Sequence, residues 1–176
     1  MIKVSQYDAS LMEDIIQFRV KAYENSRRDQ QKKHIWSFDE YDRVATHILM
    51  HSDQGDIVGA VRIIDDGEWS LEKYFKFDYD KEKGVEFGRL AVLQKFYNNK
   101  RVLFELIYAA ALFCARINKM YFYGFAVARF KQALQRARIP FEILSPPLSP
   151  YGEDSYLVRF SINEVVAFYS NNVASK

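Results

Sequence analysis

Short apolar runs separated by polar, turn-forming residues recur along the chain and predict strands, whereas longer stretches carry apolar residues at helical spacing. Strands are expected over residues 2–4, 46–50, 57–64, 85–93, 121–127, 141–144 and 155–162. Helices are expected over residues 11–23, 101–118, 128–137 and 163–169, with Asp8 or Ser10 capping the first and Asn163 the last. Residues 52–56 (SDQGD) predict a turn that joins two strands as a hairpin.

This order of elements predicts one α/β domain over residues 1–176, in which helices cover the faces of a mixed sheet. A chain of this length suits a single domain. Residues 24–37 (ENSRRDQQKKHIWS) interrupt the pattern because they are polar and basic, and we expect them to form a mobile lid or loop. Residues 71–77 are expected to be short and irregular.

Composition narrows the classes of function. A hydrophobic fraction of 49% is enough for a full core, and a net charge of +2 favours neither nucleic acid nor an acidic membrane surface as a partner. The lone Cys114 and three scattered histidines give no reason to expect a metal site or an internal disulfide, which suits a reducing cytoplasm. The longest apolar run, residues 106–114, is too short to cross a bilayer, so we expect no membrane insertion.

The segment 86–92 (EFGRLAV) places a carboxylate, a glycine and a guanidinium at the head of an apolar strand. Unpaired buried charge is costly, so these groups either pair at an exposed strand end or lie at a cleft where the sheet opens. We favour the cleft. A regular strand would put Glu86 and Arg89 on opposite faces, and a bulge near Gly88 would let them share one.

Other charged and aromatic positions accompany this strand. Arg19 is followed four residues later by Tyr23, residues 38–42 (FDEYD) precede a strand, residues 55–62 (GDIVGAVR) end in Arg62, and Phe75 lies between strands. Together with the order of elements, over about residues 15–145, this set resembles the GCN5-related N-acetyltransferase (GNAT) superfamily. In detail it is closer to the acyl-homoserine-lactone synthases and N-acyl amino acid synthases.

The resemblance implies the GNAT acyl-CoA N-acyltransferase fold, with a central strand that splays from its neighbour. It also implies an acyl group carried as a thioester on acyl carrier protein or coenzyme A, and attacked by the amine of a small acceptor. Glu86 and Arg89 would be catalytic, and the implied substrate-binding residues are Arg19, Asp39, Asp42, Arg62 and Phe75. The basic loop 24–37 either docks an acidic carrier protein or is solvated.

Chemistry supports part of this assignment. Amide formation needs a neutral amine, and Glu86 is the candidate base, directly or through a water. The developing oxyanion needs donors, which the splayed strand would supply as backbone N–H groups near Leu90, Ala91 and Val92. Direct transfer without an acyl-enzyme is expected, because Cys114 falls inside an apolar helix.

The chain departs from the superfamily at the turn that binds phosphate. Residues 96–102 (FYNNKRV) lack both glycines that let a backbone approach pyrophosphate. The remaining candidates to hold the phosphate of the donor are Asn98 and Asn99, which tolerate left-handed turns, and Lys100 and Arg101, which are otherwise solvated helix-start residues. A single phosphopantetheine phosphate needs fewer contacts from the protein than the pyrophosphate of coenzyme A does. A second departure is Gly88, where the lactone synthases usually have Ser or Thr.

Four aromatic residues could line an acyl tunnel, although an aromatic core explains them at least as well: Phe122, Phe125, Phe130 and Phe141. The sequence therefore predicts an N-acyltransferase acting on an amino acid or homoserine-lactone-like amine. Two alternatives stay open, namely an ordinary acetyl-coenzyme A-dependent acetyltransferase and a non-catalytic sensor with the same fold. Acyl length, acceptor identity and oligomeric state are left open.

Overall fold

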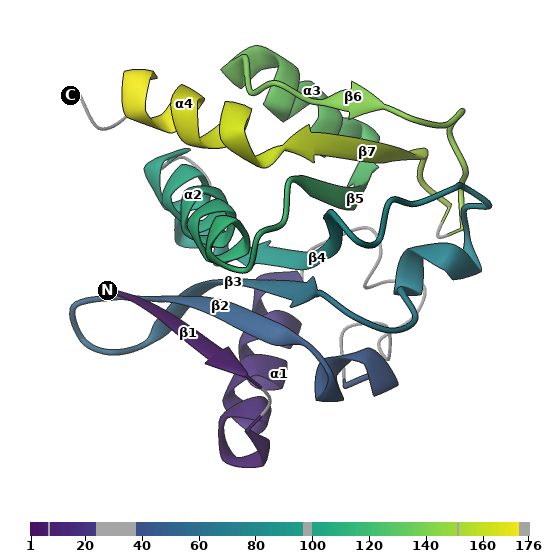
Figure 1. The fold of residues 1–176 in the computed structure, drawn as a ribbon. Coiled ribbons are helices and arrows are strands. Elements are labelled where there is room, and N and C mark those ends of the chain that lie inside the picture. Colours follow the sequence, from purple (N-terminus) through teal and green to yellow (C-terminus); the bar gives the residue numbers. More distant parts are fainter. Residues whose placement is uncertain (7, 24–37, 97–99, 151, 173–176) are drawn as a thin grey trace.

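The computed structural model describes residues 1–6, 8–23, 38–96, 100–150 and 152–172. Within these residues seven strands form one sheet in the order β1-β2-β3-β4-β5-β7-β6 (Figure 1). Only β4 and β5 pair in parallel, and the other neighbours pair antiparallel, which confirms the mixed sheet. The strands are β1 (Ile2–Gln6), β2 (Thr46–His51), β3 (Ile57–Ile64), β4 (Gly84–Val92), β5 (Tyr121–Val127), β6 (Glu142–Ile143) and β7 (Ser155–Ser161).

Four α-helices accompany the sheet in the described part of the chain: α1 (Ala9–Tyr23), α2 (Lys100–Arg116), α3 (Ala128–Ala137) and α4 (Ile162–Asn172). Asp8 caps α1, since its carboxylate accepts the Ser10 N–H at 2.9 Å. The predicted cap of α4 was wrong. This helix begins at Ile162, so Asn163 lies inside it, and the Ser161 hydroxyl accepts the Glu164 N–H instead. The prediction also lacked the single-turn 3-10 helices η1 (Glu40–Arg43), η2 (Ser70–Lys73) and η3 (Gln94–Phe96).

Alternating residues of β2 and β3 separate two cores on opposite faces of the sheet. Ile48 and Val61 pack with α2, whereas Leu49 and Ala60 pack with α1. Because successive strand residues point to opposite faces, α1 and α2 must cover opposite faces. In Figure 1, α1 lies on one side of the sheet, and α2 and α4 lie together on the other. A third, aromatic cluster around the fully buried Trp69 supports η2.

The central strand β4 is irregular in two ways. Its parallel pairing with β5 runs from Gly84–Tyr121 to Phe87–Gly124 and stops there, although both strands continue. Its pairing with β3 shifts between Arg62–Gly88 and Ala60–Ala91, so two residues of β4 oppose one of β3. This is a β-bulge at Arg89 and Leu90, and Arg89 has a φ of 54°. The expected splay and bulge are therefore present, with the bulge one residue beyond Gly88.

Candidate active site

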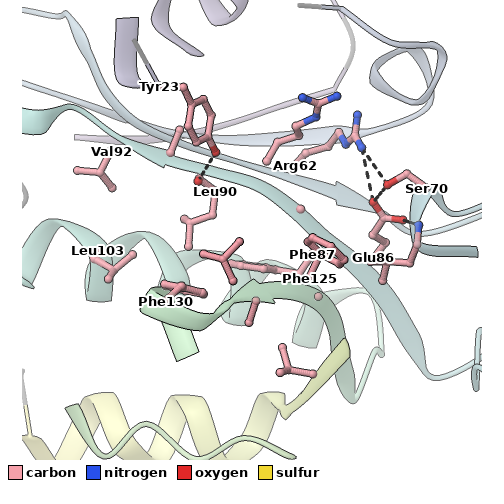
Figure 2. Close-up of a pocket in the computed structure, with 18 of the residues that line it drawn as sticks. Tyr23, Arg62, Ser70, Glu86, Phe87, Leu90, Val92, Leu103, Phe125 and Phe130 are labelled. Carbon is pink, nitrogen blue, oxygen red and sulfur yellow. Dashed lines mark hydrogen bonds and ion pairs between the residues drawn. The ribbon is translucent and has the colours of Figure 1, made fainter. Parts of the chain in front are cut away.

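A cavity of about 710 Å³ opens where β4 and β5 separate. One end of its wall is charged and comes from η1, β3, η2 and the first half of β4. The other end is apolar except for Arg129 and Arg136 of α3, and it comes from residues 90–92 of β4 and from α2, β5, α3 and β7. Figure 2 shows Arg62, Ser70 and Glu86 at one end, and Leu90, Leu103 and Phe130 away from them. The wall thus changes character along a single strand.

At the charged end, Asp39 joins two arginines that come from different strands. Arg62 Nη1 lies 2.6 Å from Asp39 Oδ1, and Arg89 Nη2 lies 2.7 Å from Asp39 Oδ2. Asp39 also caps η1 by accepting the Asp42 N–H, while Asp42 accepts the Asp39 N–H in return. This capping box fixes the carboxylate that holds both guanidinium groups in the cavity wall.

The bulge brings Arg89 to the same cavity as Glu86. A left-handed residue in a strand re-aims the side chains on either side of it, which a regular strand with this spacing would not do. The backbone conformation of Arg89 is uncommon for a residue with a side chain, and strain of this kind concentrates at functional sites.

Glu86 is almost fully buried, with 2% of its surface exposed, and each of its oxygens accepts a hydrogen bond. Oε1 accepts the Ser70 hydroxyl at 2.5 Å and lies 3.5 Å from Arg62 Nη2. Oε2 accepts the Leu71 N–H at 3.0 Å. Figure 2 shows these contacts converging on the carboxylate. These donors fix the position and orientation of the carboxylate in the cavity wall.

Behind the cavity wall lies a second, buried layer of charge. Arg19 Nη1 is 3.0 Å from both carboxylate oxygens of Asp42, and Arg62 Nη1 is 3.3 Å from Asp42 Oδ1. Both Arg19 and Asp42 have 0% exposure and neither lines the cavity. The structure therefore divides the predicted charged set into two layers, with Asp39, Arg62, Glu86 and Arg89 facing the cavity.

Burial and charge shift the pKa values of the inner layer. Desolvation lowers the pKa of Arg19, opposed by the attraction of Asp42. Burial would raise the pKa of Asp42, but Arg19 and Arg62 outweigh it and hold that pKa below its usual value. Burial and then the charge of Arg19 lower the pKa of His47 to about 4, so this imidazole is neutral. The two layers therefore contain as many guanidinium groups as carboxylates, so their charges sum to zero. The six residues are Arg19, Arg62, Arg89, Asp39, Asp42 and Glu86.

The opened part of β4 has backbone groups directed away from β3. Leu93 donates its N–H to Val58 O at 3.1 Å, on the β3 side. Because neighbouring strand residues direct their backbone groups to opposite sides, the Val92 N–H points toward the gap left by β5. The main-chain oxygen of Leu90 accepts the hydroxyl of Tyr23 at 2.6 Å. Leu90, Ala91 and Val92 all line the cavity.

The apolar end of the cavity is built by aromatic and aliphatic side chains. Of the four aromatic residues considered from the sequence, Phe125 and Phe130 line it, whereas Phe122 and Phe141 belong to the core. Phe75 does not line the cavity; it is buried and packs behind Phe125, with ring centroids 5.3 Å apart. The sequence did not single out these lining residues: Phe87, Phe96, Leu103, Phe104, Ala137, Val158 and Phe160.

The structure describes only some of the residues predicted to bind phosphate. Asn98 and Asn99, the lid at 24–37, and the side chain of Lys100 lie outside the described residues. Arg101 is largely exposed and pairs with Glu105 on its own helix at 2.6 Å, and it does not line the cavity. Arg129 and Arg136 of α3 do line it, although the sequence gave no specific reason to choose them. The sequence does show two arginines two helical turns apart, a spacing that puts both on one face of the helix.

Three further properties of the described residues complete the picture of the site. They contain no group of three or more His, Cys, Asp or Glu side chains arranged to hold a metal ion. No helix among them is long and apolar enough to cross a membrane. Cys114 is fully buried, and burial raises the pKa of its thiol to about 12, so it is a poor nucleophile.

Solved structures share this fold at low sequence identity. The acyl-homoserine-lactone synthase LasI superposes with a TM-score of 0.80 at 16% identity, covering 97% of this chain and 94% of LasI. BjaI, a coenzyme A-dependent synthase of the same kind, gives 0.76 at 15% identity over 97% and 88%. A putative N-acetyltransferase from Lactobacillus plantarum gives 0.67 at 10% identity over 92% and 97%. No curated protein sequence is similar enough to count as a match.

The fold is therefore that of the GNAT N-acyltransferases. A family model described as "N-acyl amino acid synthase FeeM" matches residues 14–153, and the chain belongs to this family. It is an acyltransferase that moves an acyl group to the amine of a small acceptor. The expected fold, enzyme class and general reaction are confirmed.

Proposed function

We propose that the enzyme joins a fatty acyl chain, carried on a phosphopantetheine thioester, to the α-amino group of an amino acid. The observation that carries the proposal is the single cavity whose wall turns from charged to apolar along β4, at the point where β4 leaves β5. An acceptor with an amine and a carboxylate suits the charged end. A long acyl chain suits the apolar end, since burying it removes apolar surface from water.

The charged end would bind the acceptor by its carboxylate. Arg89 and Arg62 both reach the cavity, and each is held by Asp39. A guanidinium binds a carboxylate with two parallel hydrogen bonds, which fixes orientation as well as position. Because the three guanidinium groups and three carboxylates of the two layers balance, a zwitterionic amino acid would add no net charge to this end of the cavity.

Glu86 would take a proton from the acceptor's ammonium group. The neutral amine would then attack the thioester carbonyl, and the Val92 N–H, which points toward the gap beside β5, would donate to the oxygen that becomes negative. The C–S bond breaks, the thiolate takes one of the two protons left on the nitrogen, and a secondary amide that keeps the other proton is formed. With Cys114 buried, the chain passes directly from donor to acceptor.

The donor would be recognised by its phosphopantetheine arm. Arg129 and Arg136 lie in the cavity wall on α3 and are the described cations best placed for its phosphate. The same arm occurs in coenzyme A and on acyl carrier protein. BjaI is described as coenzyme A-dependent, so this fold accommodates that donor in a similar protein.

The test is turnover with paired donors. Acetyl, octanoyl and palmitoyl groups would each be offered on coenzyme A and on acyl carrier protein, with a panel of amino acids as acceptors and product amides identified by mass spectrometry. The proposal expects N-acyl amino acids and a preference for the longer chains. Turnover of acetyl-coenzyme A alone would make the enzyme an ordinary acetyltransferase. A large difference between the two carriers at equal chain length would identify the physiological donor.

A further inference from the structure

Ser70 lies beside the buried carboxylate of Glu86 in the cavity wall. Its hydroxyl donates to Glu86 Oε1 at 2.5 Å, and Ser70 itself lines the cavity and is partly exposed. Glu86 is only 2% exposed, and its other oxygen is occupied by the Leu71 N–H. Ser70 is therefore the more exposed member of this hydrogen-bonded pair, and its hydroxyl offers a proton a route from the cavity to Glu86 Oε1; Figure 2 shows the two side chains together.

We propose that Ser70 is a catalytic residue that relays the acceptor's proton to Glu86. This inference rests on the proposed function, in which Glu86 is the base. The ammonium group donates a proton to Ser70 Oγ while Ser70 passes its own hydroxyl proton to Glu86 Oε1. Ser70 ends unchanged, Glu86 becomes a neutral carboxylic acid, and the amine is left with its lone pair. The proton then returns to solvent after the product leaves.

The surroundings of Ser70 hold it in this position. Trp69, the preceding residue, is fully buried in the aromatic cluster, and its main-chain N–H donates to Glu72 Oε2 at 2.8 Å. Glu72 is held in turn by Lys81 at 2.8 Å. Arg62 Nη2 lies 3.4 Å from Ser70 Oγ and orients the hydroxyl by donating to it. With the Arg62 donor on one side and the Glu86 acceptor on the other, the hydroxyl proton is directed at the carboxylate.

Gly88 offers an independent route to the same oxygen. A Cβ atom built on Gly88 would have Glu86 Oε1, at 3.3 Å, as its nearest neighbour. Gly88 is not among the residues with positive φ, so its backbone accepts a side chain. A serine at this position therefore brings a hydroxyl within reach of the atom that Ser70 contacts, from β4 rather than from η2. This allows the relay to be removed and then rebuilt.

The experiment compares Ser70→Ala, Ser70→Thr, Gly88→Ser and the double variant Ser70→Ala/Gly88→Ser, with Ser149→Ala as control. Ser149 is a loop serine bonded to Asp154, outside the cavity. We expect Ser70→Ala to lower kcat by about a hundredfold with little change in KM. Ser70→Thr and the double variant should recover at least tenfold of the loss. The proton inventory in mixed H₂O and D₂O should change from curved in the wild type to linear in Ser70→Ala, because two protons no longer move together.

Each result decides between the roles. An unchanged kcat in Ser70→Ala, while Glu86→Gln is inactive, would overturn the relay and leave Glu86 as the base. A loss of kcat that neither Ser70→Thr nor the double variant restores, with an unchanged proton inventory, would make Ser70 a merely structural residue. Full activity in Glu86→Gln would overturn the proposed base itself. Urea unfolding of every variant separates these outcomes from loss of folding.

Discussion

The hydroxyl of Tyr23, at the end of α1, donates a hydrogen bond of 2.6 Å to the main-chain oxygen of Leu90 in the bulge of β4. The two residues are 67 positions apart in the sequence. Arg19, one helical turn earlier, pairs with Asp42 beneath the cavity. The N-terminal helix therefore ties the opened part of the central strand to the charged network, and its position should affect both.

Substitution of Tyr23 by Phe tests this connection. It removes one hydrogen bond and leaves the Leu90 oxygen without that donor, so the free energy of unfolding should fall by about 1 kcal/mol. Because Leu90 belongs to the wall that positions the thioester, kcat/KM should fall by about tenfold. Tyr108→Phe is the control, since Tyr108 stacks on Tyr169 away from the cavity. Equal effects of the two substitutions would contradict a special role for Tyr23.

The two layers of charge predict different consequences for neighbouring aspartates. Asp42→Asn should cost about 3–5 kcal/mol of unfolding free energy, because it leaves the buried Arg19 without its partner. Asp39→Asn should cost less stability, since its side chain is 21% exposed, but should lower kcat/KM because Arg62 and Arg89 lose their common anchor. Urea unfolding and steady-state kinetics on both variants measure the contrast. Equal stability of the two variants would mean that the layers are not distinct.

His47 predicts an acid-sensitive contribution to stability. Arg19 Nη2 lies 3.4 Å from His47 Nδ1, so this ring nitrogen accepts a hydrogen bond from the guanidinium. His47 Nε2 then carries the proton and donates toward the main-chain oxygen of Asp42. The pKa of His47 is about 4 in the folded protein and 6.5 in the unfolded chain. The unfolded state binds the proton first, so stability should be full above pH 6.5 and fall by about 3 kcal/mol as the pH drops to about 4. Urea unfolding as a function of pH should show this loss in the wild type, and His47→Gln should remove it. The same slope in both proteins would exclude His47 as its source.

The apolar end of the cavity predicts a limit on acyl length. Ala137 lines the cavity on α3, so Ala137→Leu should reduce the space beside Phe130 and Phe160. We expect kcat/KM for palmitoyl donors to fall relative to octanoyl donors. The matched control is Ala115→Leu, an exposed position on α2 outside the cavity. A parallel loss with both donors would show that the chain does not reach Ala137.

The sequence predicted most of the fold because apolar periodicity is strong in its strands and longer helices. It missed η1 and η2, since a single helical turn has too few residues to show a period. That omission hid Ser70, whose place beside Glu86 depends on η2 packing over β4. Sequence spacing also gave no means of separating Asp39 from Asp42. Asp39 faces the cavity and Asp42 is buried, and this difference follows from the geometry of the capping box that joins them.

Phe75 illustrates the limit of transferring a role by resemblance. Its place between two strands matched the family pattern, and the structure puts it one layer behind Phe125, in contact with the cavity wall rather than in it. The bulge was anticipated from chemistry, since Glu86 and Arg89 share a face only if the strand is irregular. Its position at Arg89 follows from the pairing of β3 with β4, which the sequence of β4 alone does not specify.

The most direct test of the account is turnover by Glu86→Gln with a long-chain acyl thioester and an amino acid. Gln keeps the size of the side chain but cannot accept the amine's proton as a carboxylate does. We expect kcat to fall by about 10²–10⁴-fold, with donor binding unchanged by calorimetry and folding unchanged by urea. Wild-type turnover in this variant, at a pH where the acceptor is protonated, would show that Glu86 is not the base and that the cavity performs its chemistry in another way.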